Sequence, residues 1–170
     1  MSKAIIGIFA VLFIFSGFAE AAEGSADRMK VTSPDFENNT LMPTKVAWKN
    51  ENISPALIIE NIPAASKSLA LIVDDPDAPM GTWVHWVMYD IPVVSRIDEG
   101  SAPGTQGIND FRTQKYDGPW PPSGTHRYFF KVYALDRKLG LKEGSDKRAL
   151  ERAMKGYILD KAELIGLYRR

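Results

Sequence analysis

The stretch SLALIVDDPDAPMGTWVHWVMYDIP, residues 68–92, decides the fold. Two runs, residues 67–74 and 82–89, are rich in β-branched and aromatic residues, which is typical of β-strands. The Asp- and Pro-rich segment between them has turn chemistry, because Pro presets the backbone and Asp accepts hydrogen bonds from the chain that follows it. Both runs are apolar on both faces. This pattern predicts a sheet that is covered on both sides, or one that packs on a second sheet.

The rest of the chain repeats this pattern outward from the central stretch. Residues 56–60 and 127–135 predict further strands, and frequent Pro residues leave no room for a helix of ordinary length before residue 122. After Gly144 the spacing predicts a helix capped by Ser145. Its apolar stripe is Ala149, Leu150, Ala153 and Met154, continuing to Tyr157 and Ile158.

Two features of the C-terminal region remain to be placed. Gly156 is expected to end or kink the helix, and residues 162–168 fit either a second helix or a terminal strand. The fold class predicted is mainly β, a Greek-key-like sandwich of two antiparallel sheets with a few short helices, one of them near the C-terminus.

Composition excludes several classes of protein. The chain has 170 residues, no cysteine, and 21 acidic against 21 basic side chains. The absence of cysteine excludes a disulfide scaffold and a thiolate metal site. The balanced charge argues against nucleic-acid binding, which needs a basic surface.

The N-terminus resembles an export signal. A short cationic start, an apolar run over residues 4–18 and the Ala19-Glu20-Ala21 motif predict a signal peptide, residues 1–21, that is cleaved. The run is short of the roughly 20 residues that a membrane span needs. We therefore expect an exported chain with no membrane span, a flexible lead-in over residues 22–30 and a single domain over residues 31–170.

The residues that could carry chemistry gather in two windows. The chain's two histidines, His85 and His126, each follow a rigid loop, residues 74–79 and 118–124 respectively. Strand alternation predicts two shared faces, Trp83, His85 and Val87 on one strand and His126, Tyr128 and Phe130 on the other. Turn chemistry or core packing explains each loop and each of these residues when it is taken alone. The gathering of both histidines with the other polar and aromatic residues in two short windows is what points to a site.

A binding site fits these residues better than a catalytic one. The histidine spacing matches no helical metal motif, no Ser lies in a nucleophile elbow, and Asp75 and Asp77 are too close in sequence to form two walls of a hydrolase cleft. Imidazoles and a tyrosine hydroxyl can donate to a phosphate-like anion. A nearby carboxylate and aromatic walls would accept an ammonium group, so the set suits a small phosphorylated or zwitterionic ligand.

Two blocks carry a family resemblance. Residues 68–92 and GPWPPSGTHRYFFKVYALD, residues 118–136, resemble the signature blocks of the phosphatidylethanolamine-binding protein family, in particular its prokaryotic Raf-kinase-inhibitor-like branch. The similarity covers about residues 31–170. It implies a two-sheet β-sandwich with a small surface pocket for phosphate-type anions and phospholipid headgroups, and it implies no catalytic mechanism.

The resemblance also implies which residues form the pocket. By position they are Asp75, Pro76, Asp77, Trp83, His85, Pro121, His126 and Tyr128, with Gly118 and Pro119 shaping the rim and Trp120 as a pocket wall. No metal or organic cofactor is expected. Two other interpretations stay open, namely a protease- or kinase-inhibitor-like module that binds a protein through the pocket rim, and a hydrolase or metal enzyme.

The chain departs from the branch pattern at two positions. Trp48 and Trp120 stand where relatives often carry cysteine. We hypothesise that the two tryptophans are spatial neighbours and that aromatic packing replaces a thiol pair. Ring centroids more than about 7 Å apart would count against a direct pair.

Overall fold

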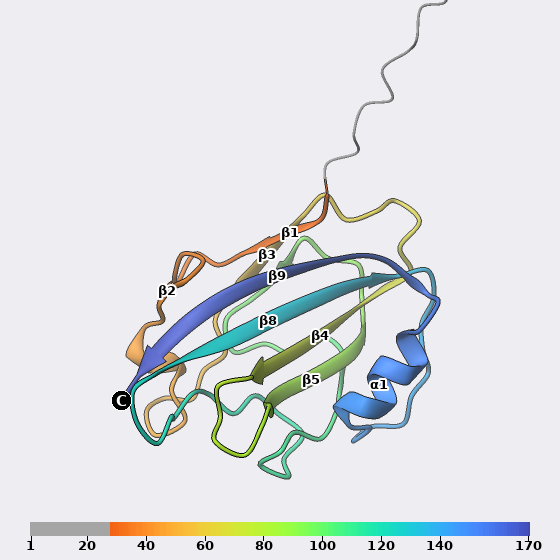
Figure 1. Cartoon of the computed structure of the whole chain (residues 1–170). Coiled ribbons are helices and arrows are strands. Elements are labelled where there is room, and N and C mark those ends of the chain that lie inside the picture. The colour runs from red at the N-terminus through yellow and green to blue at the C-terminus, as the bar shows by residue number, and fades with distance from the viewer. Residues whose placement is uncertain (1–27) are drawn as a thin grey trace, which may run out of the picture.

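Two β-sheets pack face to face in the computed structural model, which describes residues 28–170. The elements are β1 (Lys30–Thr32), β2 (Thr40–Leu41), the 3-10 helix η1 (Thr44–Val46), β3 (Leu57–Glu60), β4 (Ser68–Asp75), β5 (Trp83–Ile91), β6 (Arg96–Ile97), β7 (Thr105–Gln106), β8 (Thr125–Leu135), α1 (Lys147–Met154) and β9 (Ile158–Arg169). The small sheet has the order β1-β3-β6, and the large sheet has the order β2-β9-β8-β4-β5-β7. The predicted mainly-β sandwich is confirmed (Figure 1).

Strand β4 is the centre of the large sheet, and every one of its residues is buried. Leu69, Leu71 and Val73 face the core between the two sheets. Ala70 and Ile72 face a second apolar cluster, which α1 closes with Leu150 and Met154. The prediction of strands covered on both sides is therefore confirmed for β4, because one layer is a sheet and the other is a helix.

Pairing in the sheets is antiparallel with one exception. The short strand β2 runs parallel to β9, with Thr40 opposite Gly166 and Leu41 opposite Leu167. The expectation of wholly antiparallel sheets thus needs this correction at one edge.

The helix is shorter than the sequence pattern predicted. Asp146, and not Ser145, is its N-cap, and the Asp146 carboxylate accepts a hydrogen bond from the Ala149 N–H at 2.7 Å. Gly156 has φ +84°, a left-handed conformation that ends the helix, as expected. Tyr157 and Ile158 consequently leave the helical stripe, and Ile158 begins β9.

The last segment forms a strand, which settles the alternative left open by the sequence. Leu164, Gly166 and Tyr168 face the core, and the residues between them face outward. This period of two is the period of a strand. In Figure 1, β9 lies along β8 and ends at the C-terminus, at the opposite end of the molecule from α1.

The N-terminal boundary also differs from the expectation. Met29 is buried, its N–H donates to the Asp160 carboxylate at 2.8 Å, and Lys30 begins β1, so the end of the expected lead-in belongs to the sandwich. The predicted signal peptide and residues 22–27 lie outside the described residues. Within residues 28–170, no helix is both long and apolar enough to cross a membrane.

Candidate functional site

A cavity of about 350 Å³ opens where β4 ends and β5 and β8 begin. Its walls are aromatic, proline and small apolar side chains, and its polar groups are one carboxylate, two imidazoles and one phenol. The lining residues are Trp48, Asp75, Ala78, Pro79, Met80, Trp83, His85, Phe111, Trp120, Pro121, Pro122, His126 and Tyr128. The structure thus brings together seven of the eleven residues named from the sequence.

His85 reaches this cavity because it sits in a β-bulge. Val73 pairs with Trp86, but the next residue, Asp74, pairs with Val84, so His85 is an extra residue with no partner on β4. A bulge reverses the alternation of a strand and re-aims the extra side chain. The predicted face of Trp83, His85 and Val87 is therefore wrong for Val87, which lies in the cluster under α1.

The His85 ring is held on several sides. Its Nδ1 donates to the Asp117 carbonyl oxygen at 2.6 Å. The ring lies edge-on to Phe111 and Tyr128, with centroids 5.3 and 5.1 Å away. The side chain is buried, and this burial lowers the pKa of His85 below its usual value, against the opposing effect of the Asp117 carbonyl.

A buried polar network holds the carbonyl to which His85 donates. The Asp117 carboxylate accepts hydrogen bonds from Asn109 Nδ2 at 2.9 Å, from Asn52 Nδ2 at 3.3 Å and from the Thr113 hydroxyl. The Asp117 N–H also donates to the His85 carbonyl at 3.1 Å. Asp117 is a candidate site residue that the sequence pattern did not indicate, because its partner Asn52 lies 65 positions away in the chain.

His126 is paired with a buried carboxylate. Its Nδ1 donates to Asp75 Oδ2 at 2.7 Å, and both side chains are almost fully buried. The other Asp75 oxygen accepts the Asp77 N–H at 2.8 Å. Burial first and the Asp75 charge second raise the pKa of Tyr128, so its hydroxyl stays protonated and able to donate.

Asp77 takes part in the site indirectly. Its carboxylate forms a two-pronged ion pair with Arg127, at 2.9 Å to Nε and 2.7 Å to Nη2, and accepts the Arg127 N–H at 3.0 Å. The Arg127 hydrogen bond lowers the pKa of Asp77 to about 2. Asp77 and Pro76 therefore hold the turn beside the cavity and do not line it.

Gly118 and Pro119 lie behind the cavity. A Cβ on Gly118 would come within 1.8 Å of the Val46 carbonyl oxygen, so only glycine fits this approach. The Gly118 N–H donates to Asn52 Oδ1 at 2.8 Å. Pro119 lines a narrow gap beneath His85 and Tyr128.

Trp48 and Trp120 both line the cavity. The Trp48 N–H donates to the Pro119 carbonyl at 3.2 Å, which places Trp48 beside the segment that carries Trp120. The Trp48 ring, however, packs on Phe111 with centroids 5.5 Å apart, and the Trp120 ring lies under the Arg170 guanidinium at 5.1 Å. Phe111, which the sequence did not single out as a site residue, is thus the central wall, since it also contacts Trp83.

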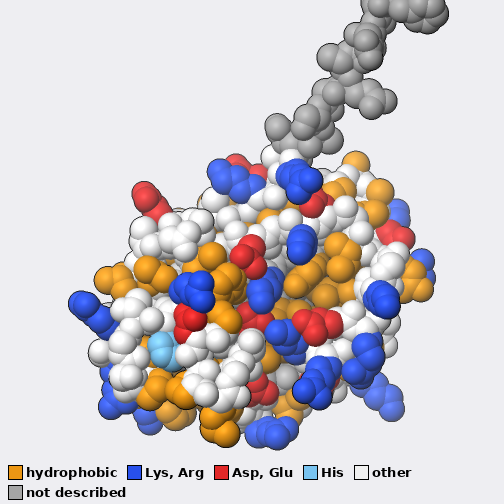
Figure 2. All heavy atoms as spheres, in the orientation of Figure 1, with side chains coloured by type: hydrophobic (Ala, Val, Ile, Leu, Met, Phe, Trp, Pro, Cys, Tyr) orange, Lys and Arg blue, Asp and Glu red, His pale blue; other side chains and the backbone are white. Residues whose placement is uncertain are grey.

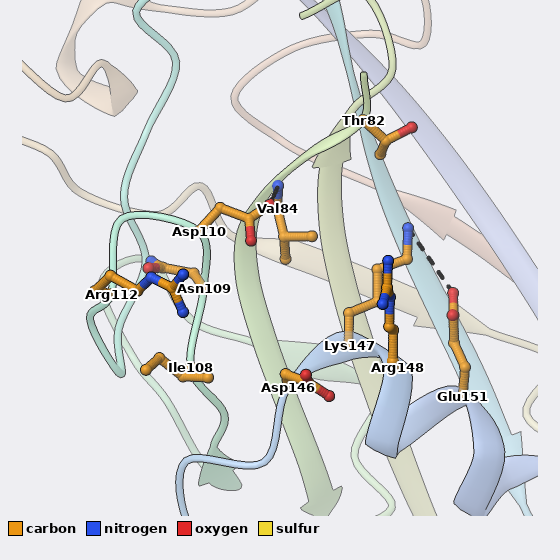
Figure 3. Close-up of a pocket in the computed structure, with 10 residues that line it drawn as sticks. All are labelled: Thr82, Val84, Ile108, Asn109, Asp110, Arg112, Asp146, Lys147, Arg148 and Glu151. Carbon is orange, nitrogen blue, oxygen red and sulfur yellow. Dashed lines mark hydrogen bonds and ion pairs between the residues drawn. The ribbon is translucent and has the colours of Figure 1, made fainter. Parts of the chain in front are cut away.

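A second cavity, of about 540 Å³, lies between α1, the start of β5 and the loop around residues 108–112 (Figure 3). Its charged side chains balance, with Arg112, Lys147 and Arg148 against Asp110, Asp146 and Glu151. The acidic groups already cap α1, accept the Val84 N–H or pair with Lys147. Because this cavity has no buried histidine or tyrosine, the aromatic cavity is the stronger candidate.

On the face that Figure 2 presents, surface charge does not point to a second site. Figure 2 shows acidic and basic side chains interspersed over the face that it presents. Within the part of the chain that the structure describes, no three His, Asp or Glu side chains gather as metal ligands.

Comparison with known proteins identifies the family. The model of the phosphatidylethanolamine-binding protein family matches residues 32–169. The chain belongs to this family. The "UPF0098 protein" of Methanothermobacter thermautotrophicus is 45% identical over 153 residues, which is 84% of this chain and 99% of that relative. The one from Pyrococcus horikoshii is 41% identical over 179 residues, covering 99% of this chain and 90% of the relative.

Solved structures of the family have the same fold. The crystal structure of CT736 from Chlamydia trachomatis, described as a homologue of the phosphatidylethanolamine-binding protein, has a TM-score of 0.81 and 40% identity, covering 84% of this chain and 98% of its own. That of Escherichia coli YbcL, described as a member of the mammalian family, has a TM-score of 0.78 and 28% identity, covering 85% of this chain and 99% of its own. The resemblance of the two signature blocks is therefore confirmed over the whole described sandwich.

Proposed function

We propose that this family member is a non-enzymatic binding protein whose aromatic cavity takes a small phosphorylated ligand, either a free phosphate compound or a phospholipid headgroup. The observation that carries the proposal is the pairing of two buried histidines in one cavity. Each is held through Nδ1, His85 by a carbonyl and His126 by a carboxylate, and Tyr128 lines the same cavity with its ring centroid 5.1 Å from that of His85.

The charges of the cavity suit a ligand with both signs. The Asp75 carboxylate would attract an ammonium group, and the Trp83 and Trp120 rings can contact a cation through their faces. The histidine and tyrosine groups would hold the phosphoryl oxygens. No nucleophile is placed opposite a general base here, so the geometry supports binding and not turnover.

Nuclear magnetic resonance of the histidine side chains tests the proposal. We expect the His85 and His126 resonances to shift during titration with inorganic phosphate or phosphoethanolamine. His85→Ala and His126→Ala should each weaken binding about 10- to 100-fold, since hydrogen bonds to charged groups contribute roughly 1.5–3 kcal/mol.

Arg148→Ala provides the matched control, because Arg148 is exposed and lines only the second cavity. It should leave the titration unchanged. Histidine resonances that stay in place at millimolar phosphate would refute the proposed function.

A further inference from the structure

The two histidines carry their protons on the side that faces the protein. A carbonyl or carboxylate oxygen can only accept a hydrogen bond, so Nδ1 of His85 and Nδ1 of His126 must be the protonated nitrogens. In a neutral imidazole the other nitrogen, Nε2, is then a lone-pair acceptor. Nε2 has no hydrogen-bond partner in either ring among residues 28–170.

Burial opposes a second proton on the His85 ring, while the charges of Asp75 and Asp117 act in the opposite direction. Four titratable groups face it, Asp75 from β4, His126 and Tyr128 from β8, and Asp117 from the preceding loop. The Asp117 carboxylate is already occupied by amide and hydroxyl donors, and Asp75 by His126. His85 is 4% exposed and its ring packs against Phe111 and Tyr128, where a charge is poorly solvated.

A phosphoryl group in this cavity therefore meets both an acceptor and a negative charge. The Asp75 carboxylate disfavours a dianion, and the nearby guanidinium of Arg127 is already paired with Asp77. A P–OH group, in contrast, can donate to His85 Nε2 while the other phosphoryl oxygens accept from Tyr128. This match needs a ligand that brings its own proton.

We propose that the cavity selects the protonated monoanion of a phosphomonoester or of inorganic phosphate, and discriminates against both the dianion and phosphodiesters. The inference rests on the proposed function and sharpens it. It makes the ligand a monoester and not the diester of an intact phospholipid headgroup, because a diester has no P–OH to offer.

The test measures the dissociation constant of the unaltered protein from pH 5 to pH 9 for two matched ligands. Phosphoethanolamine loses its second phosphoryl proton near pH 6. In 3-aminopropylphosphonate a methylene group replaces the ester oxygen, which raises the second phosphoryl pKa and leaves the ammonium group in place. Affinity should fall about tenfold per pH unit above the second pKa of the ligand. Because the phosphonate has the higher second pKa, its plot of affinity against pH should begin to fall at a higher pH.

Glycerophosphoethanolamine is the third probe, because it keeps the ammonium group and one negative charge but has no P–OH. It should bind at least about tenfold more weakly than phosphoethanolamine at pH 6. In the phosphoethanolamine complex, the His85 Nε2 resonance should be that of an unprotonated, hydrogen-bonded nitrogen.

Each contrary result has a distinct meaning. Identical pH curves for the two matched ligands would show that a protein group titrates, and would overturn the inference. Equal affinity for the diester and the monoester would also overturn it, while leaving the proposed function intact. Failure of all three compounds to bind would refute the proposed function itself.

Discussion

Asp117 shows how one residue can act on the cavity without touching its contents. Its carbonyl accepts the hydrogen bond from His85 Nδ1, and its carboxylate holds together the loop that carries Phe111. In both roles a buried oxygen of Asp117 accepts hydrogen bonds from neighbouring donors. The residue therefore sets the orientation of His85 through the backbone.

We predict that Asp117→Asn weakens both stability and ligand binding. The new amide group would face the Asn109 and Asn52 donors, and we expect a loss of about 2–3 kcal/mol in the free energy of unfolding. Urea unfolding measures this loss. The His85 nitrogen resonances provide a readout that loss of stability alone would not move, and they should shift in the folded variant.

Lys115→Met is the control for this prediction. Lys115 Nζ lies 3.7 Å from the same carboxylate, but its side chain is 61% exposed, so the pair contributes little. If the two variants gave the same small effect, Asp117 would have no positioning role.

At the scale of elements, the strands follow from the sequence and their irregularities do not. The runs predicted at 67–74, 82–89 and 127–135 correspond to β4, β5 and β8 within one or two residues at most boundaries. Branched and aromatic residues specify such strands locally. The bulge at His85 could not be predicted, because apolar residues fill both faces of β5. The sequence therefore does not show at which residue the alternation between the two faces is reversed.

The difference between local pattern and distant contacts also explains which residues of the site could be predicted. Residues named in the two blocks line the cavity when they lie on strands, as His126 and Tyr128 do, or in the loop just before β8, as Trp120 and Pro121 do. Phe111 and Asp117 come from a loop whose path depends on contacts distant in the sequence, such as the Asn52 bond. Local pattern carries no signal for contacts of this kind.

The helix cap offers a prediction at this scale. Asp146→Ala should destabilise the protein by about 1 kcal/mol, because the Ala149 N–H loses its acceptor. Chemical denaturation followed by circular dichroism would measure the change. Ser145→Ala should cost less, since the Ser145 hydroxyl donates to the Lys142 carbonyl and does not cap α1. A larger effect at Ser145 would restore the cap predicted from the sequence.

Considered as a whole, the molecule has two apolar cores separated by the large sheet. Asp74 lies on the α1 side of that sheet and is fully buried. Its carboxylate pairs with Lys131 Nζ at 2.7 Å and with Lys147 Nζ at 2.5 Å. The two lysines come from β8 and α1, so one buried charge ties three elements together.

We predict that Asp74→Ala destabilises the protein by about 3 kcal/mol, since it leaves two lysines without their buried partner. Amide hydrogen exchange should show α1 losing protection first. Glu151→Ala is the control, because Glu151 is 3.8 Å from Lys147 and half exposed. Equal losses in the two variants would contradict the central role of Asp74.

The bulge at His85 has a consequence for how this architecture can change over time. Removing that one residue would leave Val73 opposite Trp86 and Asp74 opposite Val84, now in an unbroken ladder. The pairing of β4 with β5 could continue without His85, but the Asp117 N–H and the Asn109 amide would lose the carbonyl that accepts their hydrogen bonds. The extra residue therefore serves the loop network and the cavity, and not the ladder between the two strands.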